Sequence, residues 1–375
     1  MELGFSEEQH ILRSSVASMC SDYADFKSLR IIEDSERGYS EDFWSQIKQM
    51  GLTGVTIPEE YGGSNMNLLD TAVIYEEFGR SLALSPHFIS SIMSSYLIAA
   101  LGNVKQKQLF LPNIASGNKI ITVGWLEKSA GYNKSSIMLE LKKHKNISVL
   151  NGKKHMVPYA SSATEVIVFF NDGEDVGAAL VELNQDGVSY NYQENLAKTS
   201  MYEVIFENVE IPNSMILSQD NFWSRWEEVS QKCQCLIAAE AAGGCERALY
   251  IGRDYSLERE AFGEKIGSFQ SIAHYLADGL VDVEANKLMT YQAAWAHDQN
   301  INISKFSAMA KLQACRSFRD VSATTIQIYG GMGFTVEADP QLFFRRAKHL
   351  QNYLWDDLYL EAQLEKSFFG EIIQS

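Results

Sequence analysis

Cysteine is scarce in this sequence, and its scarcity argues against two classes of protein. The chain has five cysteines among 375 residues, an odd number spread over a long chain. This number fits reduced, buried thiols better than a disulfide framework. Cys233 and Cys235 form a Cys-Gln-Cys stretch, but no second cysteine pair or histidine cluster completes a zinc site. We therefore expect neither structural disulfides nor a bound metal ion.

A net positive charge and long apolar runs are also lacking. The formal net charge is -16 at pH 7, which argues against nucleic acid or an anionic membrane surface as a partner. No apolar run approaches the roughly 20 residues that cross a bilayer. The opening MELGFSEEQH lacks the basic and apolar regions of a signal peptide. We expect a cytoplasmic protein with no membrane span and no nucleic-acid partner.

The sequence does contain enough apolar material for more than one core. Hydrophobic residues make up 46% of the chain and charged residues 21%, close to the averages of globular domains. A chain of 375 residues exceeds the usual size of a single core. Two or three packed subdomains are therefore expected.

The first third of the chain has the signals of helices. Ser6 with Gln9 resembles a capping box at the start of an apolar stripe, and Ser40 can cap a second helix. The helical pattern recurs over about 68–80 and 86–102. This part of the chain, residues 1–118, is predicted to be an N-terminal α-helical domain.

From about Ile120 the period of the apolar residues changes from helical to alternating. Strand candidates are the alternating stretch from 137 to 141, EVIVFF at 165–170, VGAALVEL from 176 and MYEVIFENVEI from 201. About 100 residues of strand pattern without a helix predict a β-sandwich or small β-barrel. We assign residues 119–222 to this middle β domain.

The last part of the chain returns to helices that are much longer than average. Apolar residues at spacings of three and four cover 223–257, 268–298, 302–329 and 340–368. Four long helices with short connections predict an antiparallel four-helix bundle over residues 223–375. The expected fold is therefore mixed α and β, with a helical domain, a β domain and a bundle in that order.

This order of domains and three sequence runs resemble the acyl-CoA dehydrogenase family. The runs are LEREAFGEKIGSFQSIAHYLAD at 257–278, QIYGGMGFTVEADPQLFFRRAK at 327–348 and Asn-Gly-x-Lys at 151–154. The resemblance implies FAD as cofactor and an acyl-CoA thioester as substrate, which is desaturated between its α and β carbons. A carboxylate of such an enzyme removes the α proton while the flavin accepts the β hydride. Electrons then pass to an electron-transferring flavoprotein.

The resemblance assigns one set of residues to the adenosine and phosphate side of an FAD site. These residues are Arg259, Phe262, Gln270, Gln327, Gly330 and Gly331. Arg259 offers a planar fork of donors suited to pyrophosphate, and Phe262 offers a ring to the adenosine end. The glycines let backbone amides approach phosphate oxygens, and the Gln270 amide can form hydrogen bonds with polar edges of the cofactor. By resemblance, the set reaches across a dimer interface to the FAD of a neighbouring subunit.

The residues aligned with the flavin-ring side differ from the family pattern. The family carries a Thr-Glu-Pro-x-Ala-Gly-Ser-Asp-like loop, and the aligned stretch here is LEKSAGYNK at 126–134. Leu126 replaces the threonine and Tyr132 the serine, which leaves Glu127, Ala130 and Gly131 as matches. After Asn-Gly-x-Lys the family shows Trp-Ile-Thr, where this chain has Met156, Val157 and Pro158. Two hydroxyl donors are missing, because neither leucine nor proline can replace them.

Both family positions of the catalytic base lack a carboxylate. In much of the family the base is a glutamate directly after the tyrosine aligned with Tyr353, and Leu354 stands there. A branch of the family places its glutamate at the position of Cys233. A cysteine in apolar surroundings is a weak base, and nothing nearby in the sequence would activate it.

Three carboxylates are candidates for a displaced base. Glu240 lies two helical turns after Cys233, about 10 Å along the same helix face, and burial would raise its pKa. A structural contact at a dimer interface is the favoured interpretation of Glu240. Among the carboxylates of this chain, Glu240 is nevertheless our candidate for the catalytic base. Asp356 and Asp357 follow the empty base position and fit helix-cap or surface roles.

The leading hypothesis is that this chain is one subunit of an α2β2 acyl-CoA dehydrogenase. It would complete the FAD site of a paralogous partner that carries the glutamate, as in heterotetramers that act on steroid or other bulky acyl-CoA thioesters. Such a role belongs to fatty-acid or steroid side-chain catabolism. One alternative is a self-sufficient homotetramer that uses Glu240 or an aspartate near 356. Two others are a non-catalytic scaffold of the same fold and an acyl-CoA oxidase.

Overall fold

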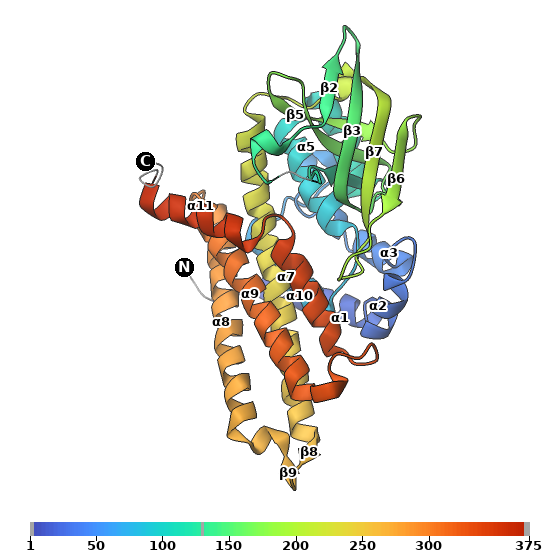
Figure 1. Cartoon of the computed structure of the whole chain (residues 1–375). Helices are drawn as coiled ribbons and strands as arrows, with labels where there is room; N and C mark the ends of the chain where they lie inside the picture. The colour runs from blue at the N-terminus through green and yellow to red at the C-terminus, as the bar shows by residue number, and fades with distance from the viewer. Residues whose placement is uncertain (1–3, 129–130, 371–375) are drawn as a thin grey trace. The chain divides into compact units, whose positions relative to one another are not determined.

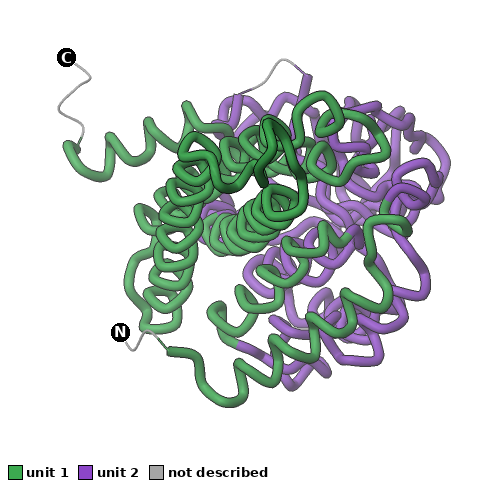
Figure 2. The backbone as a smooth tube through the Cα atoms, turned by 90° about the horizontal axis from the view of Figure 1, so that it is seen from below, with its two compact units in different colours: residues 1–29, 67–83, 231–375 green, residues 30–66, 84–230 purple. Residues whose placement is uncertain are grey.

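The computed structural model describes residues 4–128 and 131–370, which form two compact units (Figures 1 and 2). Unit 1 comprises Met1–Leu29, Asn67–Ala83 and Gln231–Ser375, and unit 2 comprises Arg30–Met66 and Leu84–Ser230. Each unit is assembled from segments that are distant in the sequence, as the two colours of Figure 2 show. The predicted boundaries at 118 and 222 remain a prediction.

A curled sheet dominates unit 2. Its strands are β1 (Ile121–Gly124), β2 (Glu140–Lys143), β3 (Ile147–Pro158), β4 (Glu165–Asn171), β5 (Val176–Glu182), β6 (Val188–Tyr192) and β7 (Met201–Pro212). They follow the order β1-β4-β2-β3-β7-β6, with β5 paired to β4. Buried side chains such as Leu141, Phe170 and Phe206 form the core that this sheet encloses. The predicted middle β domain is confirmed, although β1, β3 and β6 were not predicted as strands.

Most of the helices of unit 2 precede the sheet in the chain. They are α3 (Glu41–Gln49), a π-helical stretch η3 (Phe88–Ser94), α5 (Ser95–Leu101) and α6 (Val104–Ala115). Ser40 caps α3 by accepting the N–H of Phe43, as predicted. The helix predicted over 86–102 is a π-helical and an α-helical segment in series. Helix α6 was not predicted, although Asn103 and Gln106 form a capping box at its start.

Unit 1 contains the helical bundle. Its elements are α1 (Glu7–Tyr23), α4 (Leu68–Ser81), most of α7 (Phe222–Glu258), α8 (Gln270–Asp298), α9 (Ser304–Tyr329), α10 (Pro340–Asn352) and α11 (Asp357–Phe369). Helix α2 (Phe26–Glu33) joins the two units in sequence. The capping box of Ser6 and Gln9 opens α1 as predicted. No helix within residues 4–128 and 131–370 is both long and apolar enough to cross a membrane.

The single helix predicted over 340–368 is wrong, because the chain forms α10 and α11 with a break between them. Tyr353 is extended, and Leu354 and Trp355 have φ of 55° and 78°. These left-handed conformations cannot continue a right-handed helix. Asp356 then starts α11 by accepting the N–H of Tyr359.

Helices α4 and α7 touch backbone to backbone in unit 1. A Cβ placed on Gly79 would lie 1.9 Å from the carbonyl oxygen of Glu240, and one on Gly243 would lie 1.9 Å from that of Glu76. Only glycine fits at these two positions, since real Cβ atoms do not approach an oxygen so closely. The two glycines therefore fix the distance between the helices.

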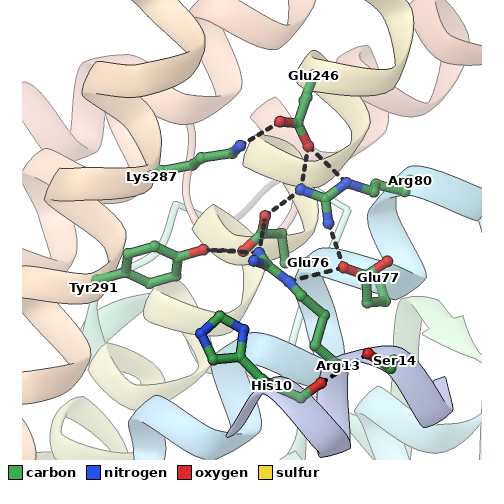
Figure 3. A network of polar contacts seen from close by, with 9 residues as sticks. All are labelled: His10, Arg13, Ser14, Glu76, Glu77, Arg80, Glu246, Lys287 and Tyr291. Carbon is green, nitrogen blue, oxygen red and sulfur yellow. Dashed lines mark hydrogen bonds and ion pairs between the residues drawn. The ribbon is translucent and has the colours of Figure 1, made fainter. Parts of the chain in front are cut away.

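Charged side chains surround this contact (Figure 3). The carboxylates are Glu76, Glu77 and Glu246, and the cations are Arg13, Arg80 and Lys287. Arg80 bridges Glu76 and Glu77 on α4 to Glu246 on α7, while Tyr291 on α8 donates to Glu76. Burial alone would lower the pKa of Arg80, but the three carboxylates raise it above its usual value. The cluster links α1, α4, α7 and α8.

We expect Gly243→Ala to lower the free energy of unfolding by about 3 kcal/mol, because the added methyl group forces α4 away from α7. Urea denaturation of the purified chain measures this change. Gly4→Ala is the control, since a Cβ there meets nothing within 4 Å. Equal stabilities of the two variants would contradict the tight α4–α7 contact.

Candidate cofactor and substrate site

One end of the bundle gathers the residues that the sequence assigns to an adenosine and phosphate site. The rings of Tyr255 and Tyr329 stack with centroids 3.9 Å apart, which ties the end of α7 to the end of α9. Beyond α7 the chain forms the hairpin of β8 (Glu260–Ala261) and β9 (Glu264–Lys265), which lies at the lower end of Figure 1. The motif that follows α7 and the motif at the end of α9 therefore belong to one end of unit 1.

The hairpin presents its side chains to solvent. Phe262 stands at its tip, where its side chain is 98% exposed and its φ is 55°. Arg259 is exposed at the base of the hairpin, and its carbonyl accepts the N–H of Ile266. Gln270 is exposed at the first turn of α8. A non-glycine residue with positive φ stores strain, which is typical of functional loops.

The glycine-rich turn after α9 provides an open backbone. Gly330 has φ of 64° and ψ of -142°, a conformation that is accessible almost only to glycine. A Cβ on Gly330 or on Gly331 would have nothing within 4 Å, so a ligand oxygen can approach the main chain there. Gln327 is exposed at the preceding turn. These residues fit the pyrophosphate and adenosine part of FAD.

Unit 2 carries the stretch aligned with the flavin-ring side. Glu127 accepts the Lys154 ammonium at 2.5 Å and the N–H groups of Met138 and Leu139 at 3.0 and 3.1 Å. This ion pair fixes the matching glutamate of the loop to strand β3. Burial lowers the pKa of Lys154 to about 8, although Glu127 raises it. Ala130, another matching residue, lies outside the described residues.

No side-chain hydroxyl is present at Leu126 or Pro158, the two positions where the family pattern has a threonine. Leu126 accepts the N–H of His155 through its carbonyl, and Pro158 is buried with its carbonyl accepting Thr122 Oγ1 at 2.5 Å. Met156 has φ of 52°, and its N–H donates to Gln193 Oε1. The main chain is well bonded here, but the side chains of Leu126 and Pro158 cannot donate a hydrogen bond.

The loop at the usual position of the base is buried and held by a lysine. Leu354 and Trp355 are each 1% exposed. Lys311, a fully buried residue of α9, donates from Nζ to the carbonyl of Trp355 at 2.7 Å and to that of Gln351 at 3.3 Å. Burial lowers the pKa of Lys311. Lys311 therefore stabilises two consecutive left-handed residues where the family pattern has its base.

The two aspartates after this loop have structural partners. Asp356 caps α11, and Asp357 accepts Arg316 Nε and Gln351 Nε2, both at 2.8 Å. These contacts agree with the cap and surface roles considered for them from the sequence. Neither arrangement resembles a carboxylate held ready for proton transfer.

Glu240 is paired with an arginine inside unit 1. Its Oε1 lies 2.9 Å from Nη1 of Arg346, whose Nη2 donates to the carbonyl of Leu82 at 3.0 Å. Burial raises the pKa of Glu240, and Arg346 offsets this only in part. At the other alternative base position, burial raises the pKa of the Cys233 thiol, which keeps it protonated. The geometry gives Glu240 a structural partner and leaves its catalytic role a prediction.

Sequence reasoning missed the three buried cations that organise these segments, namely Lys154, Lys311 and Arg346. Lys154 belongs to the Asn-Gly-x-Lys motif, Arg346 to the run at 327–348 and Lys311 to the helix predicted over 302–329. Lys311 occupies the buried stripe of α9 together with Ala308, Ala310 and Ala314. A charged residue in an otherwise apolar stripe was the available signal, because such a residue needs a buried partner.

Comparisons with known proteins agree with the family resemblance of the sequence. The family model for the acyl-CoA dehydrogenase N-terminal domain matches residues 6–118, and that for the C-terminal domain matches residues 234–354. An acyl-CoA dehydrogenase of Bacillus subtilis is 30% identical over 322 residues, which cover 82% of this chain and 85% of the relative.

Two solved structures have the same fold over nearly all of the chain. A variant of the Tcur3481–Tcur3483 steroid acyl-CoA dehydrogenase has a TM-score of 0.86 and 26% identity, covering 96% of this chain and 97% of that one. The ChsE4–ChsE5 complex from Mycobacterium tuberculosis has a TM-score of 0.89 and 21% identity, covering 98% of each chain. The predicted order of helical domain, β domain and bundle is thereby confirmed.

The low pKa of Lys154 makes stability depend on pH. The folded-state pKa of about 8 lies below the usual 10.5, so between these values the unfolded chain binds a proton that the folded chain does not. Stability therefore rises with pH in this window. We expect the wild type to gain about 2 kcal/mol relative to Lys154→Met from pH 7.5 to 10.

Denaturant titrations at the two pH values measure this gain. Lys153→Met is the control, because the Lys153 side chain is 53% exposed and should show no such change. A constant difference between the wild type and Lys154→Met at both pH values would show that Lys154 is not held at a lowered pKa.

Proposed function

This chain belongs to the acyl-CoA dehydrogenase family, and on that premise we propose that it is the subunit that completes the FAD site of a base-bearing paralogue. The two chains would form an α2β2 complex that desaturates an acyl-CoA thioester. Members of the family are FAD flavoproteins. The observation that carries the proposal is an asymmetry between two parts of this chain. Its adenosine-side residues are exposed and fit a cofactor, whereas no carboxylate stands at either family position of the base.

The exposed set suits a cofactor held mainly by another subunit. Phe262 projects from the hairpin tip with its ring in solvent, and Arg259 is exposed beside it. Arg259 would neutralise pyrophosphate charge, Phe262 would cover the adenosine end, and the amides of Gly330 and Gly331 would donate to phosphate oxygens. FAD, when bound, supplies the hydride acceptor of the reaction. The electrons would pass to an electron-transferring flavoprotein.

Each of the three candidate carboxylates already has a partner within this chain. Glu240 pairs with Arg346, Asp356 caps α11 and Asp357 pairs with Arg316. A general base must reach the proton that it removes and hold a suitable pKa. Each of these three groups is restrained by its partner, which supports a base supplied by the other subunit.

The named relatives supply a precedent for such a pair. Tcur3481–Tcur3483 and ChsE4–ChsE5 are each named as two different chains, and the former is a steroid acyl-CoA dehydrogenase. We propose the same kind of assembly for this chain, with a bulky acyl-CoA as substrate class. The competing function is a self-sufficient homotetramer with Glu240 as base, which the raised pKa of Glu240 favours.

The variant Glu240→Gln separates these two functions. If the partner supplies the base, the complex should keep its rate of flavin bleaching by acyl-CoA within about twofold, because the substituted side chain is then remote from the reacting carbon. If Glu240 is the base, that rate should fall by at least about a hundredfold. Stopped-flow absorbance of the co-purified complex measures the rate. Loss of the buried ion pair would also lower the melting temperature, which is recorded separately.

The variant Arg259→Ala tests the contribution to cofactor binding. We expect the dissociation constant of FAD from the complex to rise about tenfold or more, since a charge-assisted bidentate contact is removed. The apparent dissociation constant is obtained by titrating FAD into the deflavinated complex. Arg253→Ala is the control, because Arg253 is exposed near the same end of α7 and pairs with Asp254. Unchanged FAD affinity in Arg259→Ala would contradict the assigned role.

A further inference from the structure

A cleft in unit 2 is lined by residues that the proposed function does not use. Its volume is about 980 Å³, and it lies between the loop after α2 and the strands β6 and β7. The lining includes Glu33 at the end of α2, Asp34 and Glu36 from the loop that follows, and three tyrosines from the strands. This volume is in the range that holds a small organic molecule.

The three tyrosines form an aromatic corner. Tyr190 and Tyr192 are two residues apart on β6 and therefore point to the same face, while Tyr202 of β7 is the register partner of Tyr192. The Tyr202 ring meets the Tyr190 ring at 87° and the Tyr192 ring at 76°, with centroids 5.6 and 5.8 Å apart. Tyr190 and Tyr192 are 41% and 53% exposed. Their rings are therefore accessible to a ligand.

The charges around this corner are predominantly negative. Glu33, Asp34, Glu36 and Glu194 line the cleft, and Lys198 is its one lining cation among the described residues. Lys198 pairs with Asp34 at 2.8 Å. The carboxylates are not arranged as a metal site, since the part of the chain that the structure describes contains no group of three or more potential ligands that could hold a metal ion. The charge favours an organic cation over a bare metal ion.

A buried hydroxyl adds a polar acceptor to the lining. Ser200 is 4% exposed, lines the cleft, and its Oγ has no hydrogen-bond partner among the described residues. Gly38 lets the loop close over it, because a Cβ on Gly38 would lie 2.5 Å from Ser200 Cβ. A buried hydroxyl without a partner is unfavourable, so a ligand N–H at this position would stabilise it.

We propose that this cleft binds an organic ammonium ion. The ring faces of Tyr190 and Tyr192 attract a cation through their quadrupoles, and the carboxylates supply the opposing charge. Quaternary ammonium groups and protonated polyamines share this chemistry, and Ser200 Oγ would accept an N–H only from the latter. None of the residues that line the cleft belongs to the sets assigned to FAD or to the base.

Saturation-transfer NMR tests the proposal with tetramethylammonium and spermidine as two separate probes. We expect transfer to at least one probe in the wild type and in Tyr192→Phe, which keeps the ring. Tyr192→Leu should weaken binding about tenfold, because it removes the ring but keeps an apolar side chain. Glu194→Gln, at an exposed position, should also weaken it. Tyr275→Leu is the control, since Tyr275 is a half-exposed tyrosine of α8 in unit 1.

The pattern across the variants decides the outcome. Transfer to spermidine alone identifies an N–H donor ligand and supports the role of Ser200, whereas transfer to tetramethylammonium alone identifies a quaternary ammonium. Absence of transfer to both probes would overturn the proposal. Equal transfer in the wild type, Tyr192→Leu and Glu194→Gln would also overturn it, because binding would then occur elsewhere. Circular dichroism checks that each variant is folded.

Discussion

The backbone contact between α4 and α7 is the constraint on which the arrangement of unit 1 depends. Gly79 and Gly243 bring each helix against a carbonyl oxygen of the other. At this distance the carboxylates of Glu76 and Glu246 both reach Arg80, and Tyr291 reaches Glu76. Three carboxylates and three cations neutralise one another, so the cluster avoids the cost of an unpaired buried charge.

This constraint also determines what Glu240 can do. The Gly79 contact falls on the carbonyl of Glu240 itself, and the Glu240 side chain continues to Arg346, whose guanidinium also binds the carbonyl of Leu82 at the end of α4. Glu240 therefore joins α4, α7 and α10. A residue with this many contacts suits a structural role, which supports the proposal that the base comes from another subunit. Lys311 plays a similar part for the loop that contains Leu354.

Local signals in the sequence predicted much of the fold. Ser6 with Gln9 and Ser40 marked helix starts because a side-chain oxygen accepts a backbone N–H only a few residues away. The break at Leu354 was not predictable in this way, because its left-handed residues are held by Lys311 from another helix. Likewise, the register that places Tyr202 opposite Tyr192 is a property of the sheet and not of a local pattern. Long-range partners decide these features.

The site could be predicted only where motif and local geometry coincide. Gly330 and Gly331 appear in the sequence as a glycine pair and in the structure as an open turn. The partners of Glu240 and Glu127 could not be read from the sequence, since Arg346 and Lys154 lie 106 and 27 residues away along the chain.

The most direct test of the shared-site account is the ratio of FAD to protein. It is measured by flavin absorbance after denaturation, for the chain purified alone and for the chain co-expressed with a base-bearing paralogue. If the site is shared, the chain alone should hold little FAD and the complex about one FAD per two chains. Full occupancy of the chain alone, with bleaching when acyl-CoA is added, would contradict it.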